Sequence, residues 1–149
     1  MEDCEGGFVE ILGDNETAVY RFNISLNDGW RENPNWVNSN HTIWLSNTIG
    51  GEAGHESNNS FIYNNTVVVN RSSDPYRTAI DIRANNTKIF NNIFYSINGS
   101  KIGGKQVRVE DDNLLMTNNL YHGNIDNRFK DLDEKVIYGD PSFYNEDLG

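Results

Sequence analysis

The stretch SFIYNNTVVVN (residues 60–70) alternates apolar and polar side chains as a half-buried strand does, yet it carries two adjacent asparagines, which strands disfavour. Three similar stretches occur in the chain. Aligned on one asparagine, the four are VYRFNIS around Asn23, FIYNNTV around Asn65, KIFNNIF around Asn92 and LMTNNLY around Asn119. The aligned positions lie 42, 27 and 27 residues apart, and the two equal intervals indicate an internal repeat.

A second alternating segment precedes each of these stretches. The four segments are GFVEILG (7–13), TIWLS (42–46), AIDIR (79–83) and QVRVE (106–110), and each has two aliphatic residues on one face. Each repeat is therefore predicted to hold a strand, a short polar turn, a second strand and a connection of variable length. The extra residues fall in 27–41 and 47–60, which we expect to be loops on a repeating fold.

A period near 27 residues, with frequent Asn and no helical periodicity, predicts an all-β fold. We expect a right-handed parallel β-helix (β-solenoid) of about four coils, forming a single domain over residues 1–149. Successive coils stack about 4.8 Å apart, so equivalent side chains lie above one another. The aligned residues Asn23, Asn65, Asn92 and Asn119 are then predicted to form a hydrogen-bonded ladder at a corner. Their neighbours Asn64, Asn91 and Asn118 are expected to face the turn.

Composition limits the classes of partner. The 149 residues carry a formal net charge of −10, with a pI near 4.6, which argues against a nucleic acid or an anionic membrane as partner. No apolar run reaches the length of a membrane span, and MEDCEGG lacks the features of a signal peptide. The single Cys4 cannot form an internal disulfide.

The segments DCEGGFVEILG, YRFNISLNDGWRE, FIYNNTVVV, IFNNIFY and GDPSFYN resemble the right-handed β-helix repeat proteins of the pectate-lyase-like superfamily. Many of those proteins are bacterial and secreted. The resemblance implies a carbohydrate-active protein located outside the cell, at the cell surface or in the periplasm. It also implies that the chain is a fragment, truncated at one or both ends, whose open ends could pair with another chain.

The outward face of the first predicted strand is the expected place for function. Aligning the inward aliphatic pairs puts Glu10, Trp44, Asp81 and Arg108 in one outward column and Leu12, Ser46, Arg83 and Glu110 in a second. A Trp ring can stack on a pyranose while charged groups bind hydroxyls or uronate carboxylates. The alternative is a solvated face of alternating charges.

Two reactions on a uronate-containing polysaccharide fit this face. In a lyase, Arg83 or Arg108 would act as base or neutralise the uronate, and Asp81, Glu10 or Glu110 would hold a bridging Ca²⁺. In a hydrolase, Asp81 and Glu110 would act as the carboxylate pair, with backbones about 8 Å apart, which suits inversion. No further cofactor is expected.

Other residues are candidates for binding substrate. Trp30 and Arg31 lie in the insertion 27–41, which we expect to overhang the first strand, and His41 begins the strand that follows. No nucleotide-binding or zinc-protease motif is present. Two hypotheses therefore remain: a polysaccharide lyase or hydrolase, and a β-helix module that binds glycan or supports assembly without catalysis.

Overall fold

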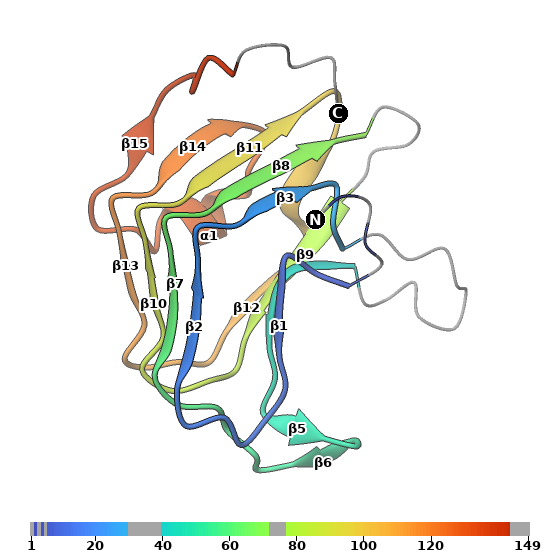
Figure 1. Ribbon diagram of the computed structural model, residues 1–149, viewed down its shortest axis with the longest axis vertical. Coiled ribbons are helices and arrows are strands. Elements are labelled where there is room, and N and C mark those ends of the chain that lie inside the picture. The colour runs from blue at the N-terminus through green and yellow to red at the C-terminus, as the bar shows by residue number, and fades with distance from the viewer. Residues whose placement is uncertain (1, 3, 5, 30–39, 72–76, 144–149) are drawn as a thin grey trace.

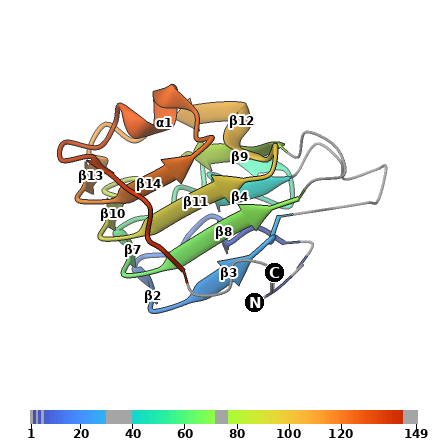
Figure 2. The same cartoon turned by 90° about the horizontal axis from the view of Figure 1, so that it is seen from above.

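The computed structural model describes residues 2, 4, 6–29, 40–71 and 77–143, and it confirms a parallel β-helix of about four coils. In Figure 1 the chain runs clockwise from the first sheet to the second and the third. Figure 2 shows that each later coil lies behind the one before it in that view, so the helix is right-handed. No helix within the described ranges is long and apolar enough to cross a membrane.

Three parallel sheets form the walls of the coil (Figure 1). The first sheet contains β1 (Val9–Ile11), β4 (His41–Leu45), β9 (Arg77–Ile82) and β12 (Lys101–Val109). The second contains β2 (Ala18–Arg21), β7 (Ser60–Tyr63), β10 (Lys88–Phe90) and β13 (Leu115–Thr117). The third contains β3 (Ile24–Leu26), β8 (Thr66–Asn70), β11 (Ile93–Ile97), β14 (Leu120–Gly123) and β15 (Ile137–Tyr138).

Each coil therefore has three strands where the sequence pattern predicts two. The predicted second strand is broken at the asparagine pair, which forms the corner between the second and third sheets. Asn64, Asn91 and Asn118 have φ angles of 54°, 54° and 57°, in the left-handed region that Asn tolerates better than most residues. In the first coil Phe22 occupies the same position, with a φ of 56°. The first asparagine of each pair thus turns the chain, and the second is free to bond between coils.

The predicted asparagine ladder is confirmed. Asn23 donates its backbone N–H and its side-chain Nδ2 to Oδ1 of Asn65, both at 3.0 Å. Asn65 bonds in the same way to Asn92, and Asn92 to Asn119, at 2.9 to 3.1 Å. Each rung from Asn65 onward also donates to a carbonyl of the preceding coil. Because Asn65, Asn92 and Asn119 are buried, these bonds satisfy groups that water cannot reach.

The core fills the space between the sheets with aliphatic and aromatic side chains. The predicted inward residues of the first sheet are buried or pack against the buried cluster, and the column Ile62, Ile89 and Met116 of the second sheet is fully buried. At the C-terminal end, Phe129 of α1 (Asn127–Lys130) is fully buried and packs edge-on against Phe94 and Tyr121. This short helix therefore covers the end of the core.

Asp126 fixes the start of that helix. Its carboxylate accepts hydrogen bonds from the backbone N–H and the guanidinium of Arg128 and lies 3.2 Å from Lys101 Nζ. The Arg128 guanidinium contributes most to holding the pKa of the Asp126 carboxyl well below its ordinary value, and Lys101 adds to the effect.

The insertion at residues 47–60 is more ordered than a loop. It contains a small antiparallel hairpin, β5 (Thr48–Ile49) paired with β6 (Glu52–Ala53), which projects from the coil below β1 in Figure 1. The sequence analysis predicts an insertion here, and the hairpin within it was not predicted. The other insertion, 27–41, lies mostly outside the described residues.

Candidate functional site

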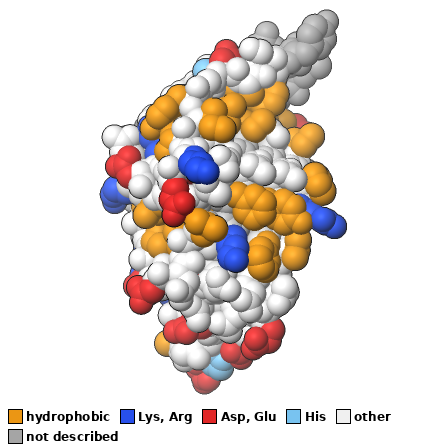
Figure 3. Space-filling model, turned by 90° about the vertical axis from the view of Figure 1, so that its left-hand side faces the viewer, with side chains coloured by type: hydrophobic (Ala, Val, Ile, Leu, Met, Phe, Trp, Pro, Cys, Tyr) orange, Lys and Arg blue, Asp and Glu red, His pale blue; other side chains and the backbone are white. Residues whose placement is uncertain are grey.

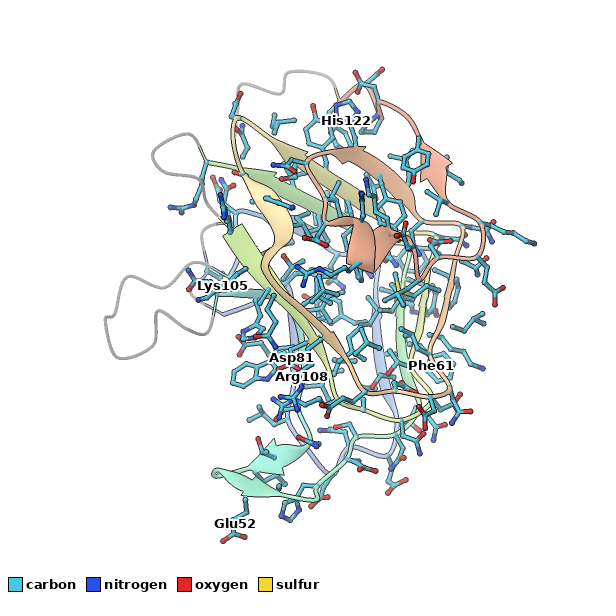
Figure 4. All side chains as sticks on the ribbon, turned by 180° about the vertical axis from the view of Figure 1, so that it is seen from behind. Glu52, Phe61, Asp81, Lys105, Arg108 and His122 are labelled. Atoms are coloured by element: carbon cyan, nitrogen blue, oxygen red, sulfur yellow. The ribbon has the colours of Figure 1, made fainter. Side chains whose placement is uncertain are left out.

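The outward columns predicted for the first sheet have the expected register. Glu10 pairs with Trp44, Trp44 with Asp81, and Asp81 with Arg108. Backbone hydrogen bonds from Ser46, Arg83 and Glu110 to the preceding coils continue the same ladder beyond the strands. We call these two columns the first-sheet strip; its members are Glu10, Trp44, Asp81, Arg108, Leu12, Ser46, Arg83 and Glu110. Figure 4 shows Asp81 and Arg108 next to each other on this face.

The strip is less exposed than a row of outward side chains would suggest. Ser46 is fully buried, and its hydroxyl bonds to Thr48 Oγ1 at 2.7 Å. Asp81 is only 5% exposed and accepts a hydrogen bond from Arg83 Nε at 2.9 Å. Arg83 donates a second bond, from an η nitrogen to Asn47 Oδ1, at 2.9 Å. Asp81 and Arg83 therefore form an ion pair that is largely shielded from solvent.

The second ion pair of the strip is open to solvent. Arg108 donates from two guanidinium nitrogens to Glu110 Oε1, at 2.8 and 2.5 Å. These bonds to Glu110 raise the pKa of Arg108, to which the charge of Asp81 also contributes. To act as a general base, Arg108 would have to lose a proton, and its bonds to Glu110 favour the protonated form. The pair suits binding better than proton transfer.

Trp44 and His41 form one stacked unit. Their ring centroids lie 5.0 Å apart with an interplanar angle of 15°. They share a face because the β4–β9 register shifts between His41 and Ile43, where the buried Thr42 bonds to Thr78. His41 is buried, so it supports the Trp44 ring from one side. Trp44 itself is half-buried, and it is the aromatic member of the strip.

A polar cleft opens where the strands of the first sheet end. Its volume is about 220 Å³. It is lined by Asn47, Glu56, Arg83, Ala84, Asn85, Glu110, Asp112 and Asn113. Arg83 and Glu110 belong to the strip, so the cleft continues it toward the turn into the second sheet. The structure thus joins two of the predicted site residues in one hollow.

Six of the cleft residues were not predicted from the sequence. Asn85 and Asn113 belong to a second, exposed row of amides, in which Asn113 donates to Asn85 and Asn85 donates to Asn58, each at 3.3 Å. These positions are 27 and 28 residues apart, close to the period of the buried ladder. That spacing could have predicted this second row of amides from the sequence. No such spacing identifies Glu56 and Asp112, because their positions depend on how the turns fold.

The remaining predictions have different outcomes. Trp30 and Arg31 lie outside the described residues. Among the residues that the structure does describe, no group of three or more His, Cys, Asp or Glu side chains could hold a metal ion. The suggested Ca²⁺ bridge between strip carboxylates therefore gains no support from their arrangement.

A second surface, on the outer face of the second sheet, is rich in apolar side chains. Figure 3 shows them gathered on that face, with basic side chains between them. Tyr63 and Phe90 stack face to face, with centroids 4.7 Å apart, and the Arg21 guanidinium lies 5.5 Å from the Phe22 ring centroid. Because Tyr63 and Phe90 stack on each other, each has one ring face that is not open to a sugar. This column is explained by packing between coils.

Comparison with known proteins adds no assignment: no protein-family model, curated protein or solved structure matches the chain. The parallel sheets and the asparagine ladder place the chain among β-helix proteins by its own architecture.

Proposed function

We propose that this protein binds a polysaccharide along the first-sheet strip, with one sugar unit in the polar cleft. The observation that carries the proposal is that the cleft opens at the end of the strip and shares Arg83 and Glu110 with it. At about 220 Å³ the cleft is smaller than the roughly 300 to 1,000 Å³ of pockets that enclose a whole small ligand. It suits one unit of a longer chain lying across the coils.

The chemistry of the surface fits a carbohydrate. Asn47, Asn85 and Asn113 offer amide donors and acceptors, and carboxylates and a guanidinium lie beside them. Half-buried Trp44, held by His41, offers an aromatic surface beside these polar groups. The proposal includes membership of the pectate-lyase-like superfamily and a location outside the cell, at its surface or in the periplasm; the three-sheet β-helix supports the first of these.

Catalysis is a second candidate function. The observation that favours it is that groups of opposite charge, Arg83 and Glu110, line one open cleft. Hydrolysis would use Asp81 and Glu110 as the carboxylate pair, and a lyase would use Arg83 or Arg108 with a strip carboxylate. Each of these four groups is bonded to a partner within the strip, so substrate would have to rearrange those ion pairs.

A glycan panel tests both candidates. Binding to immobilised polysaccharides would be measured for the unaltered chain, for Trp44→Ala and for Tyr138→Ala, in which an exposed aromatic ring is removed from the third sheet. We expect retention by at least one glycan, weakened by Trp44→Ala and unchanged by Tyr138→Ala. Retention by no glycan would overturn the proposal.

The protein would also be incubated with each polysaccharide of the panel. New reducing ends would report hydrolysis, and the absorbance of unsaturated uronates would report lyase activity. Product formation that is lost in Glu110→Gln would establish catalysis. Binding without product would leave the module as a glycan-binding protein.

A further inference from the structure

The two ends of the coil stack are built differently. At the C-terminal end, α1 covers the core and β15 adds a further strand to the third sheet. At the other end, β2 is the last strand of the second sheet within the described ranges, where it pairs with β7. Figure 2 shows β2 and β3 at one end of the stack and α1 at the other. The edge of β3 is partly taken, because Glu2 pairs with Leu26. The edge of β2 is therefore the open one.

The backbone of β2 directs hydrogen-bonding groups along this open edge. The Tyr20 carbonyl faces the second coil, where it accepts a hydrogen bond from Asn65 Nδ2 at 3.0 Å. Backbone groups of successive residues in a strand point to opposite sides, so those of Val19 and Arg21 face away from the second coil. An edge of this kind is a template for pairing with another strand.

Apolar side chains are exposed along the same edge. Val19 is 55% exposed, and Phe22 and Ile24 at the following corner are 70% and 68% exposed. Phe61 lies in the same outward column as Val19, one coil further along, and is half-buried between its neighbours. The exposure of Val19 thus reflects a neighbouring strand on one side alone. Pairing with another strand would remove this apolar surface from water.

Opposite charges lie at the two ends of β2. Glu16 precedes the strand and Arg21 ends it, and both side chains are exposed. If two copies of β2 paired in parallel, each charge would lie beside the same charge of the other copy. In an antiparallel pair, Arg21 of each copy lies beside Glu16 of the other, and opposite charges across paired strands are stabilising. The charges of β2 therefore complement a second copy of the same strand in antiparallel orientation.

We propose that the protein forms a closed dimer in which β2 pairs antiparallel with β2 of a second copy. Val19 lies on the two-fold axis, because its outward backbone N–H and C=O then exchange both hydrogen bonds with the same residue of the other copy. The pairing joins the two second sheets into one continuous sheet. Association stops at two copies, because the symmetric contact uses up the open edge and α1 closes the far end of each stack. This inference goes beyond glycan binding, since β2 lies outside the first-sheet strip.

Sedimentation velocity over a concentration series tests the dimer. Each copy carries a formal charge of −10, so the measurement is made at about 0.15 M salt, which screens charges more than about 8 Å apart. Between about 1 and 200 μM we expect the mass to rise from that of one chain to that of two and no further. The mass of one chain throughout, or growth beyond two copies, would overturn the proposal.

Three variants test whether β2 forms the contact. Val19→Lys sets two lysines opposite each other on the axis and should raise the dimer Kd at least about tenfold. Ile137→Lys, at a 46% exposed position of the edge strand β15 at the other end, should change it less than about twofold. Glu16→Gln, which removes the partner of Arg21, should raise it about two- to fivefold. All three positions are exposed, and far-UV circular dichroism would check that each variant is folded. Equal effects of the two lysine variants would overturn the assignment to β2.

Cysteine crosslinking tests the antiparallel register. In a Cys4→Ser background, Val19→Cys places two Cα atoms about 5.5 Å apart across the axis, a separation that a disulfide spans. We expect a covalent dimer on oxidation. Lys88→Cys, in the same outward column but two coils further from the axis, lies beyond the reach of a disulfide and should remain single chains. No crosslink in Val19→Cys, or equal crosslinking of both variants, would overturn the antiparallel pairing.

Discussion

Asn119 donates its backbone N–H and its side-chain Nδ2 to one oxygen of Asp133, 14 residues later, at 3.0 and 2.7 Å. The asparagine ladder thus ends in a carboxylate. A carboxylate suits this position because each asparagine of the ladder donates to the next residue along it. Asp133, which follows the last asparagine, therefore has only to accept hydrogen bonds. Tyr121 donates a third hydrogen bond to the same oxygen, and burial, with the charge of Asp133, raises the pKa of Tyr121.

Replacing that terminal acceptor should destabilise the whole coil stack. In Asp133→Ala the buried donors of Asn119 and Tyr121 lose their partner, so we expect a loss of about 3 kcal/mol in the free energy of unfolding. Chemical denaturation would measure it, with the exposed Asp131→Ala as control. Asp133→Asn, which keeps one acceptor oxygen, should lose less. A loss below about 1 kcal/mol for Asp133→Ala would contradict the role of Asp133 as the end of the ladder.

Phe22 is the one corner residue that breaks the Asn-Asn pattern, and replacing it should stabilise the protein. It has a φ of 56° and is 70% exposed, so it carries backbone strain with little burial in return. Phe22→Asn should raise the free energy of unfolding by about 1 kcal/mol. The reverse change in an inner coil, Asn91→Phe, should lower it by a similar amount. If Phe22→Asn is destabilising, the contacts of the ring with Arg21 and Tyr63 outweigh the strain.

Repetition explains which parts of the fold could be predicted. A period of 27 residues fixes which side chains stack in the later coils, and the alternating apolar pattern carries the alignment across the insertions. The ladder and the register of Glu10, Trp44, Asp81 and Arg108 could therefore be predicted. The third strand of each coil was missed because the alternation continues on both sides of the Asn-Asn corner. Only the left-handed φ of Asn64 and its equivalents separates the two strands.

The candidate site was harder to predict, since much of it lies in turns. The pairing of Asp81 with Arg83 follows from two outward positions on one strand, and could have been expected. The cleft could not, because Glu56 comes from the insertion that holds β5 and β6, and Asp112 from a turn after β12. Asp133 lies 14 residues from Asn119, outside the period, so spacing gave no sign that it ends the ladder.

Asp126 should make stability depend on acid pH. Its pKa is lower in the folded state than in the unfolded chain, so the stabilisation is complete above the unfolded value of about 4 and is lost as the pH falls through the folded value. At neutral pH, Asp126→Asn should therefore be less stable than the unaltered chain, and the gap should close on acidification below about pH 4. Denaturation curves over a pH series would show this. Asp131→Asn, at an exposed position at the opposite, C-terminal end of the same helix, should show no such convergence. A gap that stays constant with pH for Asp126→Asn would contradict the assignment.

The two ion pairs of the first-sheet strip should respond differently to truncation. The side chains of Arg83 and Asp81 are 15% and 7% exposed, whereas those of Arg108 and Glu110 are 44% and 47% exposed. Arg83→Ala leaves the Asp81 carboxylate buried without its cation and should cost about 3 kcal/mol. The double variant Asp81→Ala/Arg83→Ala should recover part of that loss, because no uncompensated charge remains. Arg108→Ala should leave the denaturation midpoint nearly unchanged while weakening glycan retention, which separates the structural pair from the pair available to ligand. If Arg83→Ala and Arg108→Ala shift the midpoint equally, burial does not distinguish the two pairs.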